Sequence, residues 1–221
     1  ALQAGLLTPF QYLCISDDTD LSDDSLWSGQ KYNIERLADK LCAKTRAQLI
    51  VDALHKYLAD EYTCRALCFC VNKRHADFMA EQLRLYGFNA QSLTSDTPAD
   101  ERKQLAKDLR EGTLHYLCVV DIFNEGVDIP EVDTVLFLRP TESLTIFLQQ
   151  LGRGLRLSAG KTELTVLDFV AQANRKYDFA SRFRALTLQP EKNIQKQIKE
   201  GFTLLPLGCS IVMEKKARQY I

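Results

Sequence analysis

The chain has 221 residues, of which 46% are hydrophobic and 26% charged, the composition of an ordinary globular protein with one main core. The formal net charge of −1 excludes a globally basic surface, so any site for a polyanion must be local. No apolar run of about eighteen residues and no signal-peptide pattern occurs, so we expect no membrane span and a cytoplasmic location.

The first part of the chain predicts one strand followed by helices. Residues 10–15 (FQYLCI) have the pattern of a strand, and the acidic run at 17–24 that follows is typical of an exposed loop. Apolar residues then recur at helical spacing over residues 34–58. We expect this pattern to break into two helices near residues 44–46.

From residue 66 onward, short apolar strands alternate with amphipathic helices, which predicts a parallel α/β sheet. The helix expected after residue 96 has Thr97 as its N-cap, Pro98 at its first position and Asp100 in its first turn. The expected strands are 66–71, 90–94, 114–120, 134–139 and 163–170, with a helix over 73–87.

The seven cysteines predict buried thiols in a reducing compartment. Their number is odd, and none stands in a C-x-x-C pair. Cys68 and Cys70 alternate within ALCFCV, which places both on one face of a strand. Because free cysteine packs like a small hydrophobe, we expect neither disulfides nor a metal site.

Three regions follow from this pattern: 1–60 with the first strand and helices, 61–172 with the alternating strands and helices, and 173–221 as a mainly helical extension. The extension begins with two polar helical stretches and ends with a pattern for a short strand and a helix. Its first helix is basic and is expected either to pack on the protein or to contact DNA, through Arg175, Lys176, Arg182 and Arg184.

Gly160-Lys161-Thr162 invites comparison with a phosphate-binding P-loop. A P-loop requires G-x-x-x-x-G-K-[ST] before a helix, but Leu155 occupies the position of the first glycine. The strand pattern at 163–170 follows instead of a helix. We therefore predict a tight turn that leads into a strand. Because no other Walker A sequence and no convincing Walker B sequence occurs, the chain alone is not expected to hydrolyse ATP.

A helix expected over 142–156 offers a different phosphate site. Its apolar residues Leu144, Phe147, Leu148, Leu151 and Leu155 form one stripe, and Gln149, Arg153 and Arg156 lie on the opposite side. Gly152 and Gly154 each cost a helix roughly 1 kcal/mol relative to alanine, which is more easily understood if a phosphate or second domain comes close. A solvated polar face is the alternative.

The loop at 119–133 (VVDIFNEGVDIPEVD) supports a ligand site. Its residues Gly126, Asp128 and Pro130 are expected at the carboxyl end of a parallel strand, where open α/β sheets bind ligands. An irregular loop with a turn glycine is the alternative.

Together these segments resemble the second RecA-like lobe of superfamily 2 helicases. Residues 66–83 resemble motif IV, residues 119–133 resemble motif V with its G-x-D-x-P, and Gln149-x-x-Gly152-Arg153-x-x-Arg156 matches motif VI. The sequence from 123 to 156 is most similar to the branch that contains the helicase subunits of type I and type III restriction enzymes and related bacterial DNA helicases. The implied fold is an α/β, parallel-sheet RecA-like lobe with a helical C-terminal extension.

The resemblance implies that ATP with Mg²⁺ is held mainly by a first lobe outside this sequence. Arg153 and Arg156 would be arginine fingers for the γ-phosphate, and Gln149 would couple the cleft to nucleic acid. The guanidinium group of arginine is planar and always charged, so it stabilises charge that develops on phosphoryl oxygens. The implied nucleotide-binding residues are Gly126, Asp128, Gly152 and, as a weaker candidate, Glu125.

Nucleic-acid contacts are also implied by the resemblance. Many relatives have threonine before the aspartate that heads motif V, whereas this chain has Val120 before Asp121, which puts that contact in doubt. The expected phosphate-contacting residues stand at strand ends, where capping or turn formation is the alternative role. They are Asn72, Lys73, Thr94, Ser95 and Thr97, with Asp121.

The predicted function is the second motor lobe of an ATP-dependent DNA helicase or translocase. The expected partners are DNA, an N-terminal RecA-like lobe of the same protein and, in some relatives, a fused nuclease domain. The alternatives are a non-catalytic RecA-like module that binds nucleic acid or a partner, and a stand-alone nucleotide-binding enzyme with measurable affinity for ATP.

Overall fold

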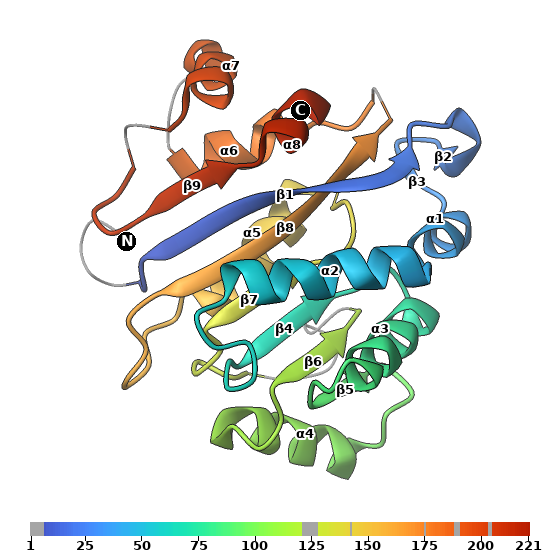
Figure 1. Cartoon of the computed structure of the whole chain (residues 1–221), viewed down its shortest axis with the longest axis vertical. Helices are drawn as coiled ribbons and strands as arrows, with labels where there is room; N and C mark the ends of the chain where they lie inside the picture. Colours follow the sequence, from blue (N-terminus) through green and yellow to red (C-terminus); the bar gives the residue numbers. More distant parts are fainter. Residues whose placement is uncertain (1–6, 121–127, 142, 175, 188–190, 203–204) are drawn as a thin grey trace.

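The computed structural model describes residues 7–120, 128–141, 143–174, 176–187, 191–202 and 205–221. Within these residues, seven strands form one sheet in the order β5-β6-β4-β7-β8-β1-β9, and every neighbouring pair is parallel (Figure 1). The strands are β1 (Phe10–Leu21), β4 (Ala66–Phe69), β5 (Ala90–Leu93), β6 (Tyr116–Val119), β7 (Thr134–Phe137), β8 (Leu164–Ala173) and β9 (Ser210–Met213). The predicted parallel α/β sheet is confirmed.

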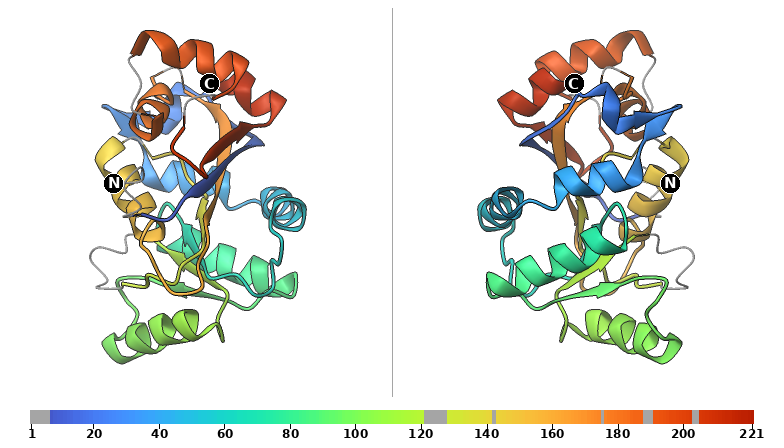
Figure 2. Two further views of the ribbon diagram at one scale, coloured as in Figure 1. Left: turned by 90° about the vertical axis from the view of Figure 1, so that its left-hand side faces the viewer. Right: turned by 90° about the vertical axis from the view of Figure 1, so that its right-hand side faces the viewer.

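Helices cover both faces of this sheet, as the two edge-on views show (Figure 2). One face packs against α2 (Lys44–Tyr57) and α3 (Lys73–Leu85), and the other packs against α4 (Ala99–Glu111) and α5 (Leu144–Gly154). The remaining helices are α1 (Ile34–Leu41), α6 (Ala180–Thr187), α7 (Glu191–Glu200) and α8 (Lys215–Tyr220), and a short hairpin joins β2 (Trp27–Ser28) to β3 (Lys31–Tyr32).

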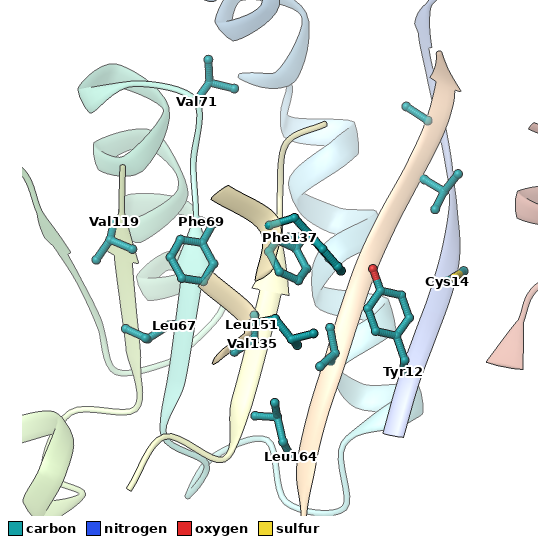
Figure 3. Close-up of a cluster of buried hydrophobic side chains, with 14 of the residues drawn as sticks. Tyr12, Cys14, Leu67, Phe69, Val71, Val119, Val135, Phe137, Leu151 and Leu164 are labelled. Carbon is teal, nitrogen blue, oxygen red and sulfur yellow. The ribbon is translucent and has the colours of Figure 1, made fainter. Parts of the chain in front are cut away.

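The central strands are buried on both faces, which explains their nearly continuous apolar sequences. Phe69 of β4 and Phe137 of β7 stack with ring centroids 5.7 Å apart, and Phe147 of α5 lies 5.2 Å from Phe137. Figure 3 shows these two strand rings beside Leu151 of α5. The core thus fixes α5 against the middle of the sheet.

All seven cysteines are free thiols. Cys68 and Cys70 are completely buried beneath α2 and α3, as the alternation of ALCFCV predicts, and Cys118 of β6 lies in the same cluster. Cys42 and Cys209 are only partly buried, so the prediction of buried thiols is wrong for these two. Burial raises the pKa of the Cys70 thiol well above its usual value. Among the described residues, no group of histidine, cysteine or acidic side chains is arranged to hold a metal ion. No described helix has the length and apolarity needed to cross a membrane.

β1 is longer than the sequence suggests, so the prediction of an exposed loop at 17–24 is partly wrong. The strand continues to Leu21 because β8 pairs with it as far as Ala173, with a shift in register between Asp17 and Asp20. The carboxylate of Asp17 is buried and accepts a 2.7 Å hydrogen bond from Nε of Arg46. Burial raises the pKa of Asp17, but the charge of Arg46 and hydrogen bonds from Thr19 lower it overall.

Two helix starts can be compared with their predictions. The expected break in the 34–58 helix is confirmed, two residues earlier than predicted, at Cys42 and Ala43. The expected N-cap of α4 is wrong: Pro98 occupies that position, and Thr97 Oγ1 accepts a hydrogen bond from the backbone N–H of Thr94 instead. The Thr97 hydroxyl, which was expected to cap α4, is therefore bonded to the backbone just after β5.

The C-terminal residues join the sheet. β9 adds an edge strand to β1, with Gln11 opposite Ser210 and Cys14 opposite Met213, and α8 follows directly. This confirms the predicted short strand and helix.

Glu214, between β9 and α8, anchors this segment. Its carboxylate accepts hydrogen bonds from the backbone N–H of Ser16 at 2.8 Å and from Lys56 at 3.0 Å, and from the hydroxyls of Ser16 and Tyr57. Burial raises the pKa of Glu214, but these hydrogen bonds outweigh burial and lower the pKa to about 2.

This anchor is expected to weaken in acid. A carboxyl group whose pKa is lower in the folded state stabilises the fold above its unfolded pKa of about 4.5, and that contribution disappears as the pH falls towards about 2. In urea unfolding, the wild-type chain should therefore be more stable than Glu214→Gln at about pH 6, and the difference should shrink steadily down to about pH 3. A difference that does not change with pH would contradict the assignment.

Candidate functional site

The candidate site is built on the last turn of α5. Ser143 caps the start of α5, accepting a hydrogen bond from the backbone N–H of Ile146. The helix is shorter than the predicted 142–156, and it presents a different face to the sheet. Leu144 and Leu148 are 36% and 41% exposed, so their prediction as part of the buried stripe is wrong.

The buried face of α5 contains a polar residue and a glycine. It consists of Phe147, Gln150, Leu151 and Gly154, at i, i+3, i+4 and i+7. The helix is therefore rotated relative to the prediction, because Gly154 allows its last turn to approach the strands. Gln149 is exposed one turn before Arg153, at the i, i+4 spacing that places both on one side of the helix.

The two glycines of α5 have different surroundings. A Cβ at Gly154 would lie 2.6 Å from Cδ1 of Leu164 and 3.1 Å from Cγ2 of Val135. The close approach expected for this glycine is thus to the sheet and involves no ligand. A Cβ at Gly152 would have none of the described neighbouring atoms within 4 Å, so the space on this side of the helix is open.

Alanine substitutions should separate these two roles. Gly154→Ala is expected to lower the free energy of unfolding by about 1–3 kcal/mol, because Leu164 and Val135 are fully buried and have little room to move. Gly152→Ala is expected to raise it by up to about 1 kcal/mol through helix propensity. Urea unfolding of the 221-residue chain measures both, and equal effects of the same sign would contradict this difference.

Arg153 and Arg156 share the carboxylate of Asp128. Arg156 forms an ion pair and hydrogen bond with Asp128, and a guanidinium nitrogen of Arg153 lies 3.9 Å from the same carboxylate. The backbone carbonyl of Asp128 accepts a 3.2 Å hydrogen bond from Arg110 of α4, and Arg110 also pairs with Glu131 at 3.6 Å. The sequence pattern predicted the arginines and Asp128 but missed Arg110, which belongs to no motif.

Asp128 and Pro130 do not lie where the sequence placed them. They were expected at the carboxyl end of a strand, but Asp128 bonds to the end of α4, just before β6, and residues 129–133 lead into the start of β7. The end of α5 lies against the first residues of β7 and β8. The cluster therefore occupies the edge formed by the amino ends of the strands. Asp121, Glu125 and Gly126 lie outside the described residues.

Gly160-Lys161-Thr162 forms the predicted turn before a strand. Gly160 has a positive φ of 80°, the backbone N–H of Lys161 donates to the carbonyl of Ser158 at 3.2 Å, and β8 starts at Leu164. This is turn chemistry, because glycine adopts the left-handed conformation without steric cost.

The expected nucleic-acid residues gather at the opposite edge. Asn72 caps α3 by accepting from the N–H of His75, and its amide donates to Glu35 at 3.1 Å. Lys73 is exposed and pairs with Asp96 at 2.6 Å.

The residues after β5 are arranged in a turn at the same edge. Thr94 is buried, Ser95 is exposed, and the Ser95 carbonyl accepts a 2.7 Å hydrogen bond from Arg102. Because β4 and β5 both run parallel to β6, these residues and those after β4 share the carboxyl edge of the sheet. The structure thus brings Asn72, Lys73, Thr94, Ser95 and Thr97 together, away from Arg153 and Arg156.

The basic residues after Ala173 lie in ion pairs. Arg182 is buried and contacts Asp168 at 2.9 Å, and Arg184 pairs with Asp178 at 3.2 Å. Lys176 lies 3.8 Å from Asp24. Packing, one of the two roles considered for this helix, therefore describes Arg182, and Arg175 lies outside the described residues.

Fold, arginine pair and motif order together define a helicase C-terminal lobe. Residues 28–158 match the family model described as the helicase conserved C-terminal domain, and this match covers more than half of the chain. The chain belongs to this family. The resemblance found through the three motifs is thereby confirmed.

Known relatives include proteins from yeast and bacteria. The chain is 28% identical over 165 residues to IRC3 of Saccharomyces cerevisiae, which is provisionally named an ATP-dependent helicase. This alignment covers 74% of this chain and 24% of IRC3. It is 25% identical over 201 residues to the type I restriction enzyme EcoKI endonuclease subunit of Escherichia coli, covering 84% of this chain and 17% of that subunit. The chain thus spans a quarter or less of the length of these two relatives.

Solved structures share the fold. A fragment of a provisionally assigned HsdR subunit of a type I restriction enzyme from Vibrio vulnificus superposes with a TM-score of 0.58 at 20% identity, covering 97% of this chain and 38% of that one. The yeast DEAD-box splicing factor Prp28 gives a TM-score of 0.60 at 15% identity, covering 97% and 37%. Both similarities show that the fold is shared.

Proposed function

We propose that this chain is the second motor lobe of an ATP-dependent DNA helicase or translocase. In this proposal another RecA-like lobe holds ATP with Mg²⁺, and the edge of this lobe that carries Arg153 and Arg156 closes on the phosphates. The relatives named as an ATP-dependent helicase and a restriction-enzyme subunit support the proposed reaction and the choice of DNA as substrate.

The observation that carries the proposal is the arrangement of Arg153, Arg156 and Asp128. Two guanidinium groups share one carboxylate, so these three side chains together carry one net positive charge. The Arg156 side chain is 46% exposed and that of Asp128 is 51% exposed, so an incoming polyanion can reach the pair. This charge and exposure fit a nucleoside triphosphate bound at the edge of the lobe.

The chemistry of arginine suits this role. A guanidinium is planar and always charged, so it can donate two parallel hydrogen bonds to phosphoryl oxygens. In the proposed closed state, phosphate oxygens replace the carboxylate of Asp128 as the partner of Arg156. Asp128 is then available to orient a ribose hydroxyl or Arg153. Gly152, Glu125 and Gly126 keep the nucleotide-facing roles implied by motifs V and VI, and Gln149 couples the cleft to nucleic acid.

The carboxyl edge of the sheet is proposed to contact the DNA backbone. Lys73 and Ser95 are exposed there, and Asn72 lies at the N-terminus of α3, where backbone N–H groups point outward. Contacts of this kind position a strand without reading its sequence. The proposed DNA-contacting residues are Asn72, Lys73, Thr94, Ser95, Thr97 and Asp121. The two proposed surfaces lie at opposite edges, so nucleotide and DNA can be bound at the same time.

The test is DNA-stimulated ATP hydrolysis by the complete protein that carries this lobe. Arg153→Ala and Arg156→Ala are compared with wild type and with Arg84→Ala, a matched control at an exposed position near the end of α3. Loss of hydrolysis in the first two variants alone supports the motor-lobe proposal. Undiminished hydrolysis in both would contradict the arginine-finger role on which the motor-lobe proposal rests.

A further inference from the structure

Lys161 joins two segments of the candidate site. Its Nζ donates hydrogen bonds to the backbone carbonyls of Pro130 at 3.1 Å and Arg156 at 2.9 Å, and to the carbonyl of Gly154. Pro130 lies two residues after Asp128, and Gly154 is the last residue of α5. One side chain therefore connects the segment that carries Asp128 with the segment that carries both arginines.

One of the three acceptors, the carbonyl of Gly154, lies at the end of α5. The last carbonyls of a helix lack partners within the helix, and a cation at this end also interacts favourably with the helix dipole. Burial lowers the pKa of Lys161 to about 8, against the opposing charges of Asp133 and Glu131, so at neutral pH the amine is an ammonium group with three donors. The three N–H groups of the Lys161 ammonium therefore match the three backbone carbonyls that it contacts.

The turn that holds Lys161 is itself fixed. The positive φ of Gly160 and the hydrogen bond from Lys161 N–H to the Ser158 carbonyl orient the lysine towards the end of α5. Thr8 adds a second connection, because its backbone N–H donates to Leu155 at 2.8 Å and its hydroxyl donates to the Arg156 carbonyl at 2.9 Å. The backbone of Arg156 is thus held from two sides.

We propose that Lys161 is a positioning residue for Arg153 and Arg156: it holds the end of α5 and the Asp128 segment in the relative arrangement that aims both guanidinium groups at the phosphates. This inference rests on the proposed function. It gives the Gly160-Lys161-Thr162 sequence a role in phosphate chemistry through the backbone of the arginine segment, without contact between the lysine and a nucleotide.

The test compares Lys161→Met and Lys161→Arg in the complete protein with Lys196→Met, a control on the exposed side of α7. Lys161→Met removes the three donors and is expected to lower kcat of DNA-stimulated ATP hydrolysis by about 10- to 100-fold, since small displacements of catalytic groups have effects of this size. KM for ATP should change less than kcat, and Lys161→Arg should recover most of the activity. Lys196→Met should match wild type.

A double-variant cycle separates positioning from a general effect on folding. If Lys161 acts through Arg153 and Arg156, Lys161→Met should lower kcat by a smaller factor in the Arg156→Ala background than in the wild type. Equal factors in the two backgrounds would overturn the inference. In the 221-residue chain, Lys161→Met should also speed hydrogen exchange at the Leu155 amide, which bonds to Leu151 in the last turn of α5.

The outcomes distinguish the two proposals. If Arg153→Ala and Arg156→Ala lose activity while Lys161→Met retains it, the positioning role is wrong and the motor-lobe proposal stands. If the arginine variants retain activity, the motor-lobe proposal fails and the role of Lys161 fails with it. Urea unfolding of each variant shows whether the fold is intact, and Lys161→Arg supplies the comparison if Lys161→Met does not fold.

Discussion

Replacing Arg156 with alanine is expected to lower kcat for DNA-stimulated ATP hydrolysis by roughly 10³-fold in the complete protein, and replacing Arg153 should have a comparable effect. The reason is electrostatic, because a fixed guanidinium stabilises charge that develops on the phosphoryl oxygens during transfer. Steady-state hydrolysis at saturating ATP and DNA measures this loss. Binding of DNA by the same variants should remain close to wild type, since the proposed DNA contacts lie at the other edge of the sheet.

Two comparisons make this expectation specific. Arg156→Lys keeps the charge but loses the planar fork, so its kcat should lie between those of wild type and Arg156→Ala. Arg84→Ala controls for the loss of an arginine elsewhere. A fall in DNA affinity that accounts for the whole loss of hydrolysis would place Arg156 in the nucleic-acid site and contradict the arginine-finger assignment.

Replacing Arg182 with methionine is expected to lower the free energy of unfolding by about 3–5 kcal/mol, the second large effect that we predict. Arg182 is 2% exposed and pairs with Asp168, which also accepts a 2.6 Å hydrogen bond from the hydroxyl of Tyr12. Arg182 donates further hydrogen bonds to the Thr141 carbonyl at 3.1 Å and to Tyr177. The variant leaves the Asp168 carboxylate buried without its cation, and urea unfolding measures the cost.

The same helix provides the control. Arg184→Met removes a side chain that is 30% exposed in its pair with Asp178, and its cost should stay below about 1 kcal/mol. The double variant Arg182→Met with Asp168→Asn removes the uncompensated charge and should recover part of the lost stability. Similar costs for Arg182→Met and Arg184→Met would contradict the buried network.

The sequence predicted the parallel sheet because its central strands are apolar on both faces, as Phe69 and Cys68 illustrate on opposite sides of β4. It did not predict the full length of β1, whose acidic second half is held in the sheet by pairing with β8. It also did not predict the N-cap of α4, because the Thr97 hydroxyl accepts from the backbone N–H of Thr94 and Pro98 stands at the cap position. Hydrophobic periodicity reports burial, whereas these details depend on hydrogen bonds, between distant strands for β1 and within one turn for α4.

Within the candidate site, a local pattern predicted the residues but not their arrangement. The spacing of motif VI singled out Arg153 and Arg156, and motif V singled out Asp128. The position predicted for Asp128 was wrong because residue spacing does not show at which edge of the sheet this aspartate lies. Lys161 was interpreted only as part of a turn, since its hydrogen bonds go to backbone carbonyls, which no side-chain pattern records.

The order of strands also bears on how the chain is made. β1 lies between β8 and β9, with Phe10 opposite Leu164 and Gln11 opposite Ser210, so both of its partner strands are synthesised long after β1 itself. Until those strands are synthesised, both edges of β1 lack their partners and remain open to other chains. Strands β4 to β7, whose pairs are closer in sequence, can associate earlier. This topology therefore requires that β1 be kept from pairing with other chains while the rest of the protein is synthesised.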